Sequence, residues 1–226
     1  MSLRRPRMVL IDLDGTLVDS VPDLAYSVDQ MMDTLGLPRR GEAAVRQWVG
    51  NGVQRLVERA LVGEIDGVPE QDLYDRALPI FMAAYTENTS GRSRVYEGVI
   101  EGLDYLRRAG YRLACVTNKP EAFTLPLLKD KGLLDYFELV VSGDSLPEKK
   151  PHPMPLLHAA ERLGCAPVDC LMIGDSKSDV RAARAAEFQI VCMSYGYNHG
   201  EDIRDYGPDA VIDSMVELAS LLEQAA

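Results

Sequence analysis

Short apolar segments alternate with amphipathic segments from residue 95 to the end of this 226-residue chain. The apolar segments are rich in Val, Ile, Leu and Cys, and the segments between them repeat apolar residues at helical spacing. This alternation predicts an α/β fold, a Rossmann-like doubly wound parallel sheet with helices on both faces. The predicted strands cover residues 112–116, 139–141, 171–173, 190–193 and 210–212, and the predicted helices cover residues 99–108, 121–131, 155–163, 179–186 and 215–224.

The apolar run at residues 8–11 is expected to be another strand of this sheet. Between residues 21 and 88, however, no strand-like alternation occurs, and amphipathic helical segments follow one another instead. We therefore expect residues 1–17 and 91–226 to form the α/β core, and residues 18–90 to form an inserted all-helical domain.

Composition limits the partners and the compartment of the protein. With 24 Lys and Arg against 35 Asp and Glu, the net charge of −11 disfavours nucleic acid or an anionic membrane as a partner. No apolar stretch approaches the ~20 residues that span a bilayer, and the run before Asp12 is too short for a signal peptide. The four cysteines show no C-x-x-C spacing, which favours free thiols in a reducing compartment. We expect a soluble cytoplasmic protein, monomeric or homodimeric.

Polar side chains follow the predicted strands at the points where the strands end. Asp12 and Asp14 follow the first strand, and Gly15 allows the chain to turn there. Three of the other predicted strands are followed by Thr117 and Asn118, by Lys150, and by Asp175 and Asp179. Ligands of open parallel sheets bind beyond the carboxyl ends of the strands, so these groups are expected to converge on one site.

This mixture of groups indicates phosphoryl transfer. Several converging carboxylates require a hard cation, and an all-oxygen ligand set suits Mg²⁺. A carboxylate that attacks a phosphate dianion is repelled by about 8 kcal/mol at ~4 Å and an effective dielectric constant of ~20. Mg²⁺ and one lysine would offset this repulsion. One Asp can then act as the nucleophile and form an aspartyl-phosphate, while the other transfers protons.

The sequence resembles the haloacid dehalogenase superfamily of phosphatases over nearly its whole length. The similarity rests on four motifs in the family's order, namely DLDGTLVDS at residues 12–20, VTN at 116–118, KPHP at 150–153 and GDSKSD at 174–179. The resemblance implies that residues 18–90 are the family's helical cap, whose closure would exclude water and select the substrate.

The resemblance also implies a role for each motif residue. Asp12 would be the nucleophile and a Mg²⁺ ligand, and Asp14 the general acid and base, with its backbone carbonyl on Mg²⁺. Asp175 would be a further Mg²⁺ ligand that Asp179 supports from behind. Thr117 and Asn118 would bind the phosphoryl group, and Lys150 would balance the negative charge. We choose Lys150 over Lys149 because it directly precedes the proline.

Within the superfamily, VGNGV at residues 49–53 and YGYN at residues 195–198 resemble the phosphoglycolate phosphatases. Gly50, Asn51 and Gly52 would form a cap loop whose backbone N–H groups take a small carboxylate before the next helix. This resemblance predicts the hydrolysis of 2-phosphoglycolate to glycolate and phosphate.

Four alternatives remain open from the sequence. The first is a phosphatase for another small phosphorylated metabolite, such as a sugar phosphate or pyrophosphate. The second is a phosphomutase that passes the phosphoryl group of the aspartyl-phosphate to a sugar. The third, a haloacid dehalogenase, would not need Asp14 as a proton donor, so the presence of Asp14 speaks against it. The fourth, a non-enzymatic receiver-like phospho-switch, fits less well because such chains are about half this length and lack a cap.

Overall fold

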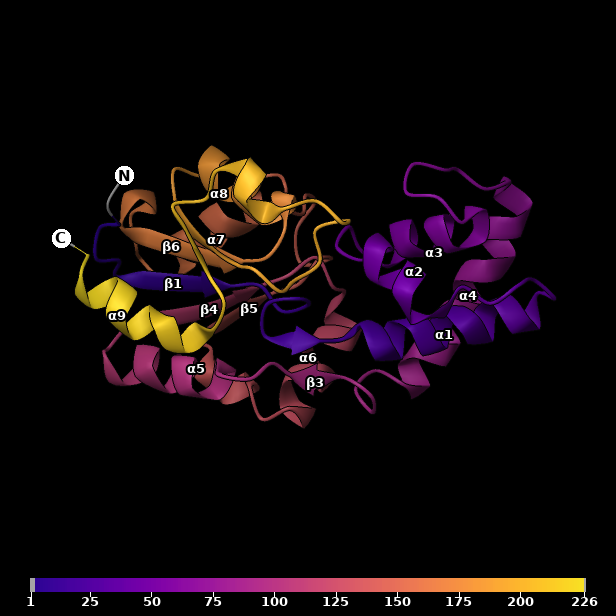
Figure 1. Cartoon of the computed structure of the whole chain (residues 1–226), viewed down its shortest axis with the longest axis horizontal. Helices are drawn as coiled ribbons and strands as arrows, with labels where there is room; N and C mark the ends of the chain where they lie inside the picture. The colour runs from indigo at the N-terminus through magenta and orange to yellow at the C-terminus, as the bar shows by residue number, and fades with distance from the viewer. Residues whose placement is uncertain (1–2, 226) are drawn as a thin grey trace.

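Six parallel strands lie side by side in the computed structural model, which describes residues 3–225 (Figure 1). Their order across the sheet is β5-β4-β1-β6-β7-β8, so the first strand of the chain lies in the middle. The chain adds β4 and β5 on one side of β1 and then adds the remaining strands on the other. The strands are β1 (Met8–Ile11), β4 (Arg112–Val116), β5 (Leu139–Val141), β6 (Cys170–Gly174), β7 (Gln189–Met193) and β8 (Ala210–Ile212).

Both faces of the sheet are covered by helices. Successive strand residues point to opposite faces, so Val9 and Ile11 of β1 pack on one side and Met8 and Leu10 on the other. One face contacts the helices α5 (Val99–Arg108), α6 (Glu121–Asp130) and α9 (Leu218–Glu223), and the other contacts α7 (Met154–Arg162) and α8 (Lys177–Ala185). Because both faces are buried, the strands are apolar along their whole length.

A second lobe of four helices lies beyond one end of the sheet, on the right of Figure 1. These helices are α1 (Val21–Thr34), α2 (Gly41–Trp48), α3 (Val53–Val62) and α4 (Gln71–Glu87). They share a hydrophobic core of their own, in which Met31 and Phe81 are fully buried. Phe123 and Tyr197 from the α/β part of the chain complete that core, so the lobe packs directly against the sheet end.

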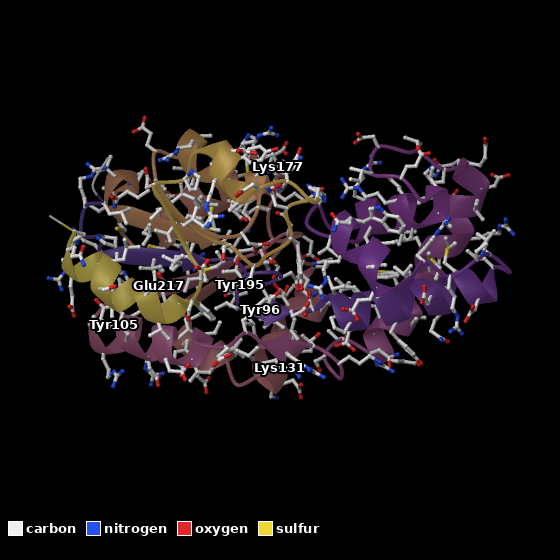
Figure 2. The ribbon with its side chains drawn as sticks, viewed as in Figure 1. Tyr96, Tyr105, Lys131, Lys177, Tyr195 and Glu217 are labelled. Carbon is white, nitrogen blue, oxygen red and sulfur yellow. The ribbon has the colours of Figure 1, made fainter. Side chains whose placement is uncertain are left out.

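A short antiparallel ribbon joins the two parts. The chain enters the helical lobe through β2 (Val18–Asp19) and returns through β3 (Arg94–Val95). Beside the ribbon, Tyr96 and Tyr195 place their ring centroids 4.2 Å apart (Figure 2). The buried Asp23 carboxylate accepts hydrogen bonds from the backbone N–H groups of Arg92 and Ser93, which fixes the returning segment to α1.

The predicted fold class is confirmed, and the predicted strands and long helices are present near the expected positions. The ribbon strands β2 and β3 were not predicted because two residues are too few to show a period. The helix expected at residues 215–224 begins as a 3-10 turn over Met215–Glu217. Further 3-10 turns cover Leu134–Tyr136, Pro167–Asp169 and Ile203–Tyr206.

The ribbon adjoins the boundaries expected near residues 18 and 90, and a division into two domains at those boundaries stays a prediction. Within residues 3–225, no helix has both the length and the apolar character that crossing a membrane requires.

Candidate active site

The carboxyl ends of β1, β4 and β6 meet at a cavity between the sheet and the helical lobe. The cavity has a volume of about 440 Å³ with its open mouth included. Its wall on the sheet side is polar, and its wall on the lobe side is mainly apolar. The lining residues are Asp12, Asp14, Thr117, Asn118 and Lys119 from the sheet side, and Leu24, Val49, Gly50, Gly52, Val53 and Leu56 from the lobe.

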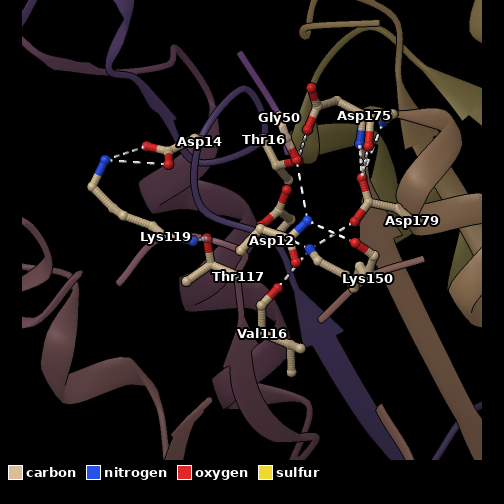
Figure 3. Close-up of polar contacts among 12 residues, drawn as sticks. Asp12, Asp14, Thr16, Gly50, Val116, Thr117, Lys119, Lys150, Asp175 and Asp179 are labelled. Atoms are coloured by element: carbon tan, nitrogen blue, oxygen red, sulfur yellow. Dashed lines mark hydrogen bonds and ion pairs between the residues drawn. The ribbon is translucent and has the colours of Figure 1, made fainter. Parts of the chain in front are cut away.

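Asp12 and Lys150 form a buried ion pair in the middle of this site (Figure 3). Lys150 Nζ lies 2.9 Å from Asp12 Oδ1 and donates hydrogen bonds to Asp179 Oδ1 and the Val116 carbonyl, both at 2.7 Å. Burial raises the pKa of Asp12 to about 7, although the Lys150 charge opposes the rise. Burial alone would lower the pKa of Lys150, but the Asp12 and Asp179 carboxylates outweigh it and raise that pKa.

Three carboxylates converge beside this pair. One oxygen from each of Asp12, Asp175 and Asp179 lies within 4.8 Å of the others, and all three residues are buried. The pKa of Asp175 is raised well above its ordinary value by burial and by the charges of Asp179 and Asp12. Such crowding favours a bound cation, because a cation removes both the desolvation cost and the mutual repulsion.

The donor set fits Mg²⁺. Asp12 Oδ1 is buried, and its contact with Lys150 lacks the direction of a hydrogen bond, so within the described residues this oxygen accepts none. Asp179 is already engaged, since it accepts hydrogen bonds from Lys150 Nζ and from the backbone and hydroxyl of Ser176. Asp12 and Asp175 are therefore the carboxylates best placed to hold the ion, with Asp179 supporting them.

Two glycines leave the space that Asp175 occupies. A Cβ atom on Gly15 or Gly196 would collide with the Asp175 side chain, and Gly15 also has a φ of +88°. In this space, Asp175 Oδ1 accepts a hydrogen bond from Thr16 Oγ1 at 2.7 Å, and Oδ2 accepts one from the backbone N–H of Tyr197 at 2.6 Å. The Asp175 carboxylate is thus held in one orientation by groups from two distant loops.

Asp14 is bound on the opposite side of the site. Its carboxylate turns toward Lys119 and away from the cluster around Asp12 (Figure 3). Lys119 Nζ donates to both Asp14 oxygens, at 3.1 and 3.2 Å, and contacts the Tyr85 hydroxyl at 2.5 Å. Burial by itself would lower the pKa of Lys119, but Asp14 and Tyr85 outweigh it and raise that pKa. Tyr85 belongs to α4, so this contact joins the helical lobe to the sheet end.

The residues expected to bind the phosphoryl group lie at the same cavity. Thr117 lines it and accepts a hydrogen bond from the Lys119 backbone N–H at 3.2 Å. Asn118 donates hydrogen bonds from Nδ2 to the carbonyls of Gly50 (3.1 Å) and Lys150 (2.9 Å). Both hydrogens of this group are therefore engaged, and one of the two contacts has to break before Nδ2 can donate to a phosphoryl oxygen.

The structure brings two of the three predicted loop residues to the cavity. Gly50 and Gly52 line it, and their φ angles of +123° and +90° are ones that glycine adopts without strain. Asn51 does not line this cavity. It lies instead beside an exposed depression with Lys149 and Pro151.

Sequence reasoning did not assign roles to three residues that hold the site together. Thr16 and Tyr197 orient Asp175, and Tyr85 contacts Lys119. The sequence could have indicated a role for Thr16, because its hydroxyl group belongs to the DLDGTL motif. Tyr85 carries no such signal, since its spacing is that of any core residue on the helix.

Comparison with known proteins agrees with this geometry. The sequence model of the haloacid dehalogenase-like hydrolases matches residues 6–187, so the chain belongs to this family. A phosphoglycolate phosphatase of Nitrosococcus oceani is 65% identical to it over 224 residues, which are 99% of this chain and all of the relative. Another, of Nitrosospira multiformis, is 49% identical over 97% of both chains.

A solved structure from Haemophilus somnus, described as a predicted phosphoglycolate phosphatase, superposes with a TM-score of 0.90. It is 35% identical, and the match covers 96% of this chain and 98% of that one.

Proposed function

We propose that this protein is a Mg²⁺-dependent phosphatase that hydrolyses 2-phosphoglycolate to glycolate and phosphate through an aspartyl-phosphate on Asp12. The observation that carries the proposal is the buried Asp12 carboxylate, paired with Lys150 and crowded by Asp175 and Asp179 at the cavity. The names of the full-length relatives support the choice of substrate.

The metal would be held by Asp12, by Asp175 and by the backbone carbonyl of Asp14. When bound, it supplies the positive charge that lets an anionic carboxylate and an anionic phosphate approach each other. Lys150 adds a second positive charge from within the protein, at 2.9 Å from Asp12. Asp179 holds Lys150 and the Ser176 turn in place.

The reaction then has two steps. In the first, an oxygen of Asp12 bonds to phosphorus, the ester P–O bond breaks, and Asp14 gives a proton to the departing oxygen. In the second, Asp14 takes a proton from a water molecule that attacks the phosphorus, which frees Asp12 and releases phosphate. Both steps require Asp14 to leave the position beside Lys119 that it occupies in this structure.

The helical lobe is proposed to act as a cap over the reaction. Its side chains Leu24, Val49, Val53 and Leu56 form the apolar wall opposite the carboxylates. A wall of this kind excludes water from the reacting groups when a substrate fills the cavity. The four cysteines are free, which supports a cytoplasmic setting for the enzyme.

A phosphate-release assay with Mg²⁺ over small phosphorylated acids, sugar phosphates, nucleotides and pyrophosphate tests the proposal. We expect the highest kcat/KM for 2-phosphoglycolate, and no turnover by Asp12→Asn. A sugar phosphate or pyrophosphate hydrolysed with a higher kcat/KM would show that the substrate is assigned wrongly. Phosphate release by Asp12→Asn at more than a few per cent of the wild-type rate would show that Asp12 is not the nucleophile.

A further inference from the structure

Lys119 is a buried cation that the reaction described above does not use. It follows Thr117 and Asn118 after β4, is 5% exposed, and lines the cavity. Its ammonium group contacts Asp14 (Figure 3) and the Tyr85 hydroxyl. Asp14 balances this buried charge in the structure, and an incoming anion that takes the place of Asp14 would keep it balanced.

The charge of the cavity wall singles Lys119 out. Among the described residues that line the cavity, Lys119 is the one cation. Lys150 is paired with Asp12 behind the cavity wall and does not line the cavity. The lobe side contributes four apolar side chains and two glycines. A substrate with a second negative group, besides its phosphate, can pair with the Lys119 charge inside the cavity. The Lys149 ammonium group lies next to Gly52, but Lys149 lines the neighbouring exposed depression instead.

Lys119 is also fixed relative to a predicted phosphate ligand. Its backbone N–H donates to Thr117 Oγ1 at 3.2 Å, so both residues belong to one tight turn. Thr117 and Lys119 line the same cavity, so a small molecule whose phosphate binds at Thr117 can present a second acidic group to the Lys119 ammonium group.

We propose that Lys119 binds the carboxylate of the substrate, and that this carboxylate displaces the Asp14 carboxylate from Nζ. The inference rests on the proposed function and names the residue that selects its substrate class, a phosphorylated short-chain acid. Two carboxylates close together repel each other, so the incoming one favours departure of Asp14. The departure frees Asp14 for the ester oxygen, and a substrate without a carboxylate leaves Asp14 bound.

The loop at Gly50 and Gly52 is a weaker candidate for the same task. Backbone N–H groups at the start of α3 offer only partial positive charge, whereas Lys119 offers a full charge. The Gly50 carbonyl, furthermore, accepts a hydrogen bond from Asn118, so this part of the loop presents an acceptor to the sheet side.

The test compares two esters that differ in one group. Ethyl phosphate has a methyl group where 2-phosphoglycolate has its carboxylate. We expect the wild-type enzyme to prefer 2-phosphoglycolate in kcat/KM by about 10- to 150-fold, the range for one charge-assisted hydrogen bond in a buried site. Lys119→Met should reduce this ratio to within a few-fold of one. Lys119→Arg, which keeps the charge, should retain part of it.

Lys129→Met is the matched control, because Lys129 is exposed at the far end of the following helix α6. It should keep the wild-type ratio. If Lys119→Met slows both esters by the same factor, Lys119 only supports the fold or Asp14, and the inference is wrong. If wild-type enzyme itself shows no preference for 2-phosphoglycolate over ethyl phosphate, the proposed function fails first.

Binding to the metal-free protein gives a readout that does not depend on turnover. Trp48 is the single tryptophan and precedes Val49 of the cavity wall, so its fluorescence can follow ligand binding. In EDTA, wild-type protein should bind 2-phosphoglycolate more tightly than ethyl phosphate, and Lys119→Met should bind both alike. A difference in Kd that persists in Lys119→Met overturns the inference.

Tyr85→Phe provides a second variant in case Lys119→Met does not fold. It removes one partner of Nζ while the lysine charge remains. A less firmly held ammonium group should lower the preference for 2-phosphoglycolate several-fold in the same direction. Equal loss on both esters would count against the role of Lys119 as strongly as the same result with Lys119→Met.

Discussion

Replacing Asp12 by Asn should stabilise the metal-free protein at alkaline pH while abolishing turnover. Burial raises the pKa of Asp12 to about 7 in the folded protein, against an ordinary value of 3.8. The folded state therefore keeps this proton to a higher pH than the unfolded chain does. The contribution of this bound proton to the free energy of unfolding is fully present below about pH 4 and is lost as the pH rises to about 7. The difference between the two pKa values corresponds to at most about 4 kcal/mol.

Urea unfolding in EDTA between pH 5 and pH 8 measures this effect. Wild-type protein should lose free energy of unfolding with a slope of up to about 1.4 kcal/mol per pH unit from this one group. Asp12→Asn should lack that part of the slope and be the more stable protein at pH 8. Added Mg²⁺ should stabilise the wild type, because it binds the ionised carboxylates, and should stabilise the variant much less.

Asp33→Asn is the control for this experiment. Asp33 is on the protein surface and pairs with Arg39 at 2.5 Å, which lowers the pKa of Asp33. Its substitution should slightly destabilise the protein above pH 4, the opposite sign to Asp12→Asn. If Asp12→Asn is less stable than wild type at pH 8 in EDTA, burial does not hold the Asp12 carboxylate in an unfavourable ionised state.

Three further substitutions test the other parts of the site. Lys150→Met should lower the free energy of unfolding by about 3–5 kcal/mol in urea titrations, because it leaves buried carboxylates unpaired. The control Lys149→Met should change this free energy by less than about 0.5 kcal/mol. Equal effects of the two substitutions would mean that the buried pair has no special role. Asp14→Asn should slow hydrolysis of the aspartyl-phosphate, so rapid quenching should trap labelled enzyme, and no trapped label would contradict its acid–base role. Gly196→Ala should weaken Mg²⁺ binding at least tenfold in calorimetry, because the added Cβ displaces Asp175; an unchanged affinity would remove Asp175 from the ligand set.

The sheet and its order of elements could be predicted because each buried strand and each amphipathic helix carries a local period. Met8–Ile11 is apolar without interruption because β1 is covered on both faces, and that pattern is visible in four residues. The ribbon strand Val18–Asp19 could not be predicted, since it exists only through pairing with Arg94–Val95, seventy-odd residues later.

The sequence by itself determined which chemical groups follow the strands: the carboxylates of Asp12 and Asp175 come at the ends of the apolar runs 8–11 and 171–173, and the ammonium group of Lys150 belongs to the loop after the run 139–141. The tertiary structure alone decided which groups meet. Lys119 contacts Asp14 across 105 positions and Tyr85 across 34, and Gly196 leaves room for Asp175 on another loop. The physical reason is that periodicity reports which face of an element is buried, whereas contacts between loops depend on how whole elements pack in space.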